Sequence, residues 1–254
     1  MNFRKLILAP MAMALLGVAG LTALPRDANA IPTLQLGIAG GSYDLATQTI
    51  VSSGPSFSLY AFLLPDSSNT LGDTYYLSMA LTPQVSTAGN LGSFTVDGNT
   101  VNATADMTYG TPPLDALHLG SDPGDLAKHS IFPTYFREQG FAFSGGNQSG
   151  IFNTQDQPSW GPQSGTGMYY QRFDINTSNL ASGFAVHFDL YNTRLCINGR
   201  GQCNAAGDID ITQFAPFSHD AQSAPTGVPE PGTLALLGLG LLGLGLARKK
   251  ASAK

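Results

Sequence analysis

The side chains best suited to chemistry lie on one predicted strand, residues 184–191. Apolar and polar residues alternate along it, and since successive side chains of a strand point to opposite faces, His187, Asp189 and Tyr191 share one face. A histidine and an aspartate at this spacing can orient one another or share a metal ion, although two ligands are fewer than a zinc site requires. The alternative, which we favour, is an ordinary exposed histidine. We therefore expect no metal centre and treat the three residues as part of a candidate ligand surface.

The sole tryptophan, Trp160, is the fourth residue of this candidate ligand surface. It lies in the segment QPSWGP at residues 157–162, and Tyr169 and Tyr170 follow shortly after. An exposed indole can stack on a sugar ring, whereas an indole turned inward covers the hydrophobic core. The sequence leaves both interpretations open.

Two acidic clusters offer oxygen ligands for calcium. Asp122 and Asp125 flank a Pro-Gly pair, and Asp208 and Asp210 flank an isoleucine. Hard oxygen ligands suit calcium, but the EF-hand loop pattern is absent. Turn formation by itself explains aspartate beside proline and glycine. We therefore expect no cofactor, with calcium at these clusters as the weaker alternative.

Cys196 and Cys203 are the only cysteines, and they flank a glycine-rich turn. An exported protein enters an oxidising compartment, where an even number of cysteines forms disulfides. Their spacing is wider than that of a zinc-binding pair, and no second pair exists. We predict a disulfide that closes a short hairpin loop.

The sequence lacks several common catalytic motifs. The patterns G-x-S-x-G, H-E-x-x-H and S-x-x-K are absent. A G-x-G-x-x-G pattern at residues 238–243 lacks the βαβ unit and the acidic residue of a dinucleotide site. We therefore expect a protein that is not an enzyme. The alternative is a carbohydrate-active hydrolase that pairs carboxylates far apart in the sequence, with Glu138 and one of Asp156, Asp174 and Asp189 as candidates.

The elements that must position these residues are strands. Segments of alternating polarity, bounded by Gly, Pro, Asn and Asp, predict strands at residues 33–38, 47–52, 56–64, 73–82, 93–96, 101–107, 140–144, 168–176, 183–192 and 209–214. The pattern predicts an all-β fold, an antiparallel two-sheet sandwich with a jelly roll as one variant.

The connections between the strands carry two further signals. Asp97 and Gly98 stand between alternating segments and predict a tight hairpin, because both tolerate positive φ. Residues 110–133 and 145–167 are long and irregular. We expect them either to form a binding surface or to cover sheet edges.

The first thirty residues have the three zones of a secretory signal peptide: a basic start, an apolar stretch at residues 6–21, and small residues at Ala28 and Ala30. The apolar stretch is shorter than the roughly 20 residues that span a bilayer. We expect signal peptidase to cut after Ala30, which makes Ile31 the first residue of the exported protein.

The C-terminal end also has three parts. Residues 233–247 form a predicted transmembrane helix, and the basic tail at 248–254 predicts a cytoplasmic C-terminus. The residues that precede and begin the helix are Val228, Pro229, Glu230, Pro231, Gly232 and Thr233. This end resembles the PEP-CTERM sorting signal of Gram-negative bacteria. The resemblance implies that a membrane enzyme, exosortase, cuts near residues 229–231 and releases the protein to the cell surface or the extracellular matrix.

Residues 31–227 form the predicted cargo domain between the two signals. The segments PTLQL at 32–36, GSYD at 41–44, FSLY at 57–60 and HSIFPTYF at 129–136 are similar to the exported bacterial family called choice-of-anchor N. That resemblance implies no activity and assigns no role to any residue.

The net charge of the cargo domain bears on which classes of ligand it can bind. Five basic side chains against fifteen acidic ones give a formal charge of −10. Because a nucleic-acid-binding protein presents a basic stripe, this charge disfavours that class, and we expect no nucleic-acid partner. We expect a non-enzymatic surface or matrix component that binds polysaccharide or neighbouring proteins. Ice binding is a minor alternative, because only Thr47 and Thr49 form a T-x-T pair of the kind that ice-binding surfaces repeat.

Overall fold

The computed structural model describes residues 31–113, 126, 129–192 and 214–226. Within these ranges the chain folds into strands and one short 3-10 helix, η3. The elements are β1 (Leu34–Ile38), β2 (Ser42–Asp44), β3 (Thr49–Val51), β4 (Ser56–Leu63), β5 (Tyr75–Thr82), β6 (Ser93–Val96), β7 (Asn99–Asn102), β8 (Thr108–Gly110), β9 (Thr134–Phe141), β10 (Gln148–Gly150), β11 (Gly167–Asn176), β12 (Ala185–Asn192), η3 (Phe217–His219) and β13 (Ala221–Gln222).

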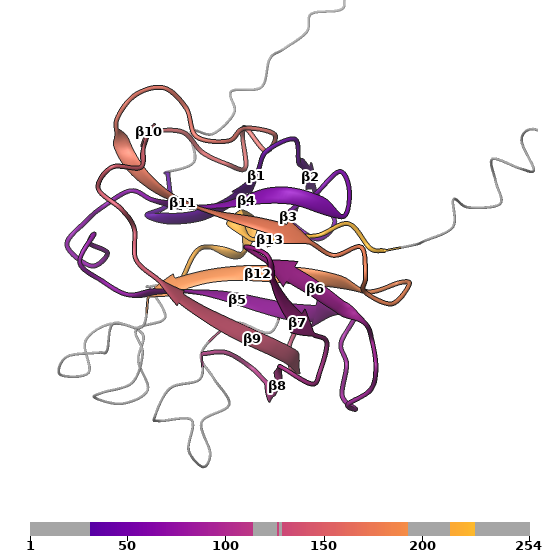
Figure 1. Ribbon diagram of the computed structural model, residues 1–254. Helices are drawn as coiled ribbons and strands as arrows, with labels where there is room; N and C mark the ends of the chain where they lie inside the picture. Colours follow the sequence, from indigo (N-terminus) through magenta and orange to yellow (C-terminus); the bar gives the residue numbers. More distant parts are fainter. Residues whose placement is uncertain (1–30, 114–125, 127–128, 193–213, 227–254) are drawn as a thin grey trace, which may run out of the picture. The chain divides into compact units, whose positions relative to one another are not determined.

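The strands form two sheets. Sheet A has the order β1-β4-β11-β6-β7, with β10 beside β11, and sheet B has the order β2-β3-β13-β12-β5-β9-β8. Figure 1 shows β4 and β11 in one layer and β12, β5 and β9 in the other. The all-β, two-sheet prediction is confirmed. The prediction of purely antiparallel sheets is wrong at one place, because β13 pairs parallel with β3. The jelly-roll variant stays a prediction.

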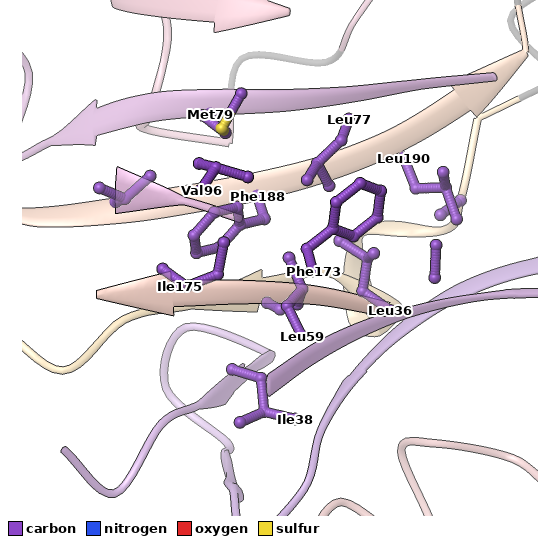
Figure 2. Packing of buried hydrophobic residues seen from close by; sticks show 14 of the residues in the cluster. Leu36, Ile38, Leu59, Leu77, Met79, Val96, Phe173, Ile175, Phe188 and Leu190 are labelled. Atoms are coloured by element: carbon purple, nitrogen blue, oxygen red, sulfur yellow. The ribbon is translucent and has the colours of Figure 1, made fainter. Parts of the chain in front are cut away.

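The main hydrophobic core lies between the two sheets. On β4 and β11 every second side chain points inward, including Leu59, Phe173 and Ile175. Met79 of β5 and Phe188 of β12 face them from sheet B (Figure 2). These side chains are almost completely buried. The alternation at residues 184–191 predicts Val186, Phe188 and Leu190 on one face, and all three lie in this core. On each strand, the side chains between the inward-pointing ones lie on the outer face of the sheet.

The β6–β7 hairpin confirms the turn that the sequence predicts. Asp97 has φ of 49° and Gly98 has φ of 78°, while Val96 pairs with Asn99 across the turn. Two successive residues in the left-handed region are the signature of a two-residue type I′ turn.

The predicted boundaries are wrong where strands are short or polar. The strand predicted at 140–144 is β9, which begins at Thr134 and carries Arg137, Glu138 and Gln139 in its middle. The strand predicted at 101–107 is β7, which ends at Asn102. Strands β2, β8, β10 and β13 have two or three residues each, too few to show alternation.

Several predictions fall outside the described residues. In the part of the chain that the structure describes, no helix is long and apolar enough to cross a membrane. The predicted signal peptide, transmembrane helix, sorting motif, disulfide and the four aspartates of the calcium clusters all lie in ranges that the structure does not describe. The same holds for most of the strand predicted at 209–214.

Candidate functional site

Strand pairing brings a second acidic residue, Asp220, beside His187 and Asp189. In sheet B, His187 pairs with Gln222 and Phe188 pairs with Ala221 in an antiparallel register. Continuing this register by one residue places Asp220 next to Asp189 on the same face of the sheet. We refer to His187, Asp189 and Asp220 as the polar cluster.

The polar cluster is buried. His187 is 1% exposed, Asp189 2% and Asp220 3%. The prediction that His187 and Asp189 share a face is confirmed, but the prediction of an exposed histidine is wrong. Phe217 and neighbouring segments cover the outer face of sheet B at this point, and the rings of His187 and Phe217 lie 6.5 Å apart.

The ligand atoms of the polar cluster converge on one point. His187 Nε2 lies 3.3 Å from Asp189 Oδ1 and 3.9 Å from Asp220 Oδ2. One such atom from each of the three residues lies within 4.8 Å of the others. Three atoms of the polar cluster have no hydrogen-bond partner among the described residues: the two ring nitrogens of His187 and Asp189 Oδ2. Burial and the charge of Asp189 raise the pKa of the Asp220 carboxyl well above its usual range.

A cavity of about 740 Å³ adjoins the polar cluster on the outer face of sheet B. Its lining includes His187, Thr47, Thr49, His129, Phe217 and Gln222. The rings of His129 and Phe217 stack at 3.8 Å, and both His129 and Ser130 have positive φ. Positive φ is costly for residues other than glycine. Residues with such strained backbone conformations cluster at active sites, ligand clamps and switch regions. Partial burial lowers the pKa of His129.

Tyr191 does not contribute to a ligand surface. It is completely buried, and its hydroxyl donates a hydrogen bond to the carboxylate of Glu138. Burial and the charge of Glu138 raise the pKa of Tyr191 well above 10. Its ring lies against Tyr76 and Phe214. The tyrosine is therefore a packing residue of sheet B.

The carboxylates of the hydrolase alternative do not gather in the cavity. Glu138 and Asp189 both flank Ser78 on sheet B, by the pairing of β5 with β9 and with β12, but neither lines the cavity. Asp174 pairs with Arg172 on the other sheet, and Asp156 is exposed in the segment after β10. The ice-binding alternative needs exposed threonines, and Thr49 is 1% exposed.

Trp160 lies near the outer face of sheet A, whereas the polar cluster lies on the outer face of sheet B. Its ring packs near Phe152, and Phe152 packs edge-on against Phe62 on the outer face of sheet A. Tyr60 and Tyr170 continue this group, with ring centroids 5.9 Å apart. We refer to Trp160, Phe152, Phe62, Tyr60 and Tyr170 as the aromatic face. Tyr169, by contrast, packs against the main core. The four residues predicted as one candidate ligand surface therefore belong to two outer faces.

The aromatic face is open to solvent and bordered by polar groups. Trp160 is 41% exposed, and Tyr60 and Tyr170 are half-buried. Arg172 pairs with Tyr60 across the strands and binds Asp174 Oδ1 at 2.6 Å. The hydroxyl of Ser58 also donates to Asp174. The hydrogen bond from Arg172 is the main reason that the pKa of Asp174 is lowered.

Gln35 fixes the segment that carries Trp160. Its side chain is completely buried, donates to the carbonyl of Phe152 and accepts hydrogen bonds from the amide and hydroxyl of Thr154. The side-chain amide of Gln35 is buried and uses both its donor and its acceptor groups. Such a satisfied hydrogen-bond network holds the bound segment in one position. Part of the segment predicted at residues 145–167 covers the outer face of sheet A, where Phe152 packs on Phe62, and it leaves Trp160 exposed. The alternative that this segment forms a binding surface stays a prediction.

Asp220 is the site residue that sequence reasoning missed. It follows η3 and precedes a two-residue strand, so no alternation marks it. Nor did the sequence give a reason to group His129 with His187, because the residues are far apart in the chain and meet only at the cavity.

Comparison with known proteins identifies the C-terminal segment. Residues 227–250 match the PEP-CTERM protein-sorting motif. The match supports an exported protein with a C-terminal membrane-anchor-like sorting region, for which exosortase is the processing partner. No curated protein and no solved structure matches the chain. The resemblance of the cargo to the choice-of-anchor N family finds no support in these comparisons.

Proposed function

We propose that the chain is a non-enzymatic component of the cell surface or extracellular matrix that binds polysaccharide through the aromatic face. In this proposal signal peptidase cuts after Ala30, and the C-terminal helix anchors the protein in the inner membrane with its basic tail in the cytoplasm. Exosortase then cuts near residues 229–231. The sorting motif supports the route.

The observation that carries the binding role is the exposed indole of Trp160 beside Tyr60 and Tyr170. Aromatic side chains with a polar tip suit ligands that are apolar on one face and hydroxylated at the edge, as sugar rings are. The half-buried rings are held by Phe62 and Phe152 beneath them. Little side-chain entropy is therefore lost when a ligand binds.

The polar border fits the same ligand. Arg172 and Asp174 place hydrogen-bond donors and acceptors next to the aromatic rings. The formal charge of −10 on the cargo opposes an acidic polymer. A neutral polysaccharide is therefore the ligand that best matches both the aromatic face and the charge.

Titration of the full chain in detergent with the organism's own exopolysaccharide tests the proposal. Because Trp160 is the only tryptophan, its fluorescence reports binding directly, and we expect the ligand to protect it from acrylamide quenching. In calorimetry, Trp160→Ala and Tyr60→Ala should each weaken binding at least about tenfold, the loss typical of a central contact residue.

Tyr109→Ala is the matched control, because Tyr109 is an exposed tyrosine on β8 of sheet B. It should bind as the unmodified chain does. No binding at millimolar polysaccharide, or binding that needs a surface protein of the same cell instead, would count against the polysaccharide role.

A further inference from the structure

We propose that His187, Asp189 and Asp220 bind one divalent transition-metal ion, with Zn²⁺ as the expected ion, beside the cavity on the outer face of sheet B. This site is separate from the aromatic face and does not depend on polysaccharide binding.

The first argument is the unsatisfied convergence of the ligand atoms. Buried polar atoms almost always have a hydrogen-bond partner, and an exception needs an explanation. Both ring nitrogens of His187 lack a partner among the described residues, as does Asp189 Oδ2. His187 Nε2 nevertheless lies close to an oxygen of each carboxylate, at 3.3 and 3.9 Å. Polar atoms that lie this close together without forming hydrogen bonds have the arrangement of ligands around a shared metal ion.

The second argument is charge. Two adjacent buried carboxylates can both be ionised at low cost only where a cation compensates them. In the described ranges the basic side chains are Arg137 and Arg172. Arg137 donates to the carbonyl of Asp106, and Arg172 pairs with Asp174. Neither is bound to the polar cluster, so no cationic side chain of the described ranges compensates the two carboxylates, and a divalent cation would do so.

The donor set selects the kind of ion. One imidazole nitrogen and two carboxylate oxygens suit zinc and similar transition metals, whereas calcium takes six to eight oxygen ligands. Three protein ligands leave a fourth position of a tetrahedral site open. His187 also lines the cavity, which gives the ion a path of entry.

The sheet geometry holds the ligands in advance. His187 and Asp189 lie two residues apart on β12, and β12 is paired on both sides, with β5 and β13. Asp220 is fixed through its backbone, since its amide donates to Phe217 and its carbonyl accepts from Ile50. Ligands placed on paired strands need little reorganisation when the ion binds.

Calorimetric titration of the chelator-treated full chain in detergent with ZnCl₂ tests this site. We expect one Zn²⁺ per chain, bound at least 100-fold more weakly after Asp220→Asn or His187→Gln. Asp106→Asn is the matched control, because it makes the same change at an exposed aspartate, and it should bind Zn²⁺ unchanged. At a free Zn²⁺ concentration 100 times the Kd, the melting temperature of the unmodified chain should rise by about 5 to 10 °C.

A second readout separates a metal site from a structural ion pair. In chelator, Asp220→Asn should melt at the same temperature as the unmodified chain or higher, because it removes one of two adjacent carboxylates. A fall of several degrees in chelator would instead mean that Asp220 is a partner of the protonated histidine, and would overturn the proposal. So would the absence of stoichiometric binding by the unmodified chain at 1 mM Zn²⁺, or binding that both variants retain.

Discussion

At the scale of single residues, burial and neighbours give the same side chain different roles. Asp174 is exposed and forms an ion pair with Arg172, which lowers its pKa, and it borders the aromatic face. Asp189 is buried beside His187 and a second carboxylate. One aspartate is therefore suited to hydrogen-bonding a soluble ligand, and the other to holding a cation.

The ion pair on the aromatic face predicts a shift in titration. The pKa of Asp174 is lowered chiefly by its hydrogen bond from Arg172. Arg172→Gln should therefore raise the pKa of Asp174 toward 3.8, which a carboxyl-carbon NMR titration measures. Because the folded pKa is the lower one, the pair stabilises the fold above the unfolded pKa, and this stabilisation is lost as the pH falls through the folded pKa.

The matched control for this titration is Arg137→Gln, an arginine on another strand that hydrogen-bonds a backbone carbonyl. It should leave the Asp174 titration unchanged. An unchanged Asp174 pKa in Arg172→Gln would show that the hydrogen bond is not kept in solution.

At the scale of elements, turns and covering segments decide where the outer faces are exposed. The β6–β7 hairpin depends on positive φ at Asp97 and Gly98. The segment over sheet A depends on Gln35, which reaches it from β1. The first is a local backbone effect, and the second links residues more than a hundred positions apart.

A substitution at Gly98 in the β6–β7 hairpin would measure the cost of backbone strain separately from any steric clash. An added Cβ at Gly98 would meet no atom within 4 Å, but φ there is +78°. Gly98→Ala should therefore lower the free energy of unfolding by about 1 kcal/mol through strain alone. Gly54→Ala is the matched control, since a Cβ there also meets nothing and its φ is outside the left-handed region. Equal urea-unfolding curves for the two variants would contradict the type I′ geometry.

The covering segment gives a second prediction at this scale. Gln35→Leu leaves the buried amide of Thr154 and the carbonyl of Phe152 without their partner. We expect a loss of about 2 to 4 kcal/mol in the free energy of unfolding, and weaker polysaccharide binding because Trp160 loses its support. Gln171→Leu, a change at an exposed hydrogen bond, should cost less than about 1 kcal/mol. Similar losses for both variants would mean that Gln35 does not hold the segment.

At the scale of the whole molecule, the sandwich separates the aromatic face from the polar cluster. Sheet A carries Tyr60 and Tyr170 on its outer face, and sheet B carries His187 and Asp189 on its own. The main core lies between them. Substitution of Tyr60 or Tyr170 should therefore leave Zn²⁺ binding at the polar cluster unchanged in calorimetry.

Processing is the prediction that concerns the complete chain. The protein recovered from the surface and medium fractions should begin at Ile31 and end near residues 229–231, because both signals are removed. If Cys196 and Cys203 are joined, its intact mass should rise by about 2 Da on reduction. A protein found only in membranes with Lys254 still present would mean that the tail is a permanent anchor.

The sequence by itself determined the properties that depend on local patterns. Alternation assigned the long strands β4, β5, β11 and β12, and Asp97-Gly98 placed a hairpin, because side-chain direction and turn conformation depend on neighbouring residues. The sorting motif at residues 227–250 could also be recognised from the sequence, because its residues are contiguous in the chain.

Only the tertiary structure decided burial and the meeting of distant residues. The alternation that placed His187 and Asp189 on one face could not tell that other segments cover this face. Asp220 joins them through β12–β13 pairing, and Trp160 is placed by a glutamine on β1. Both outcomes depend on strand register and packing between segments far apart in the chain, which a one-dimensional pattern does not encode.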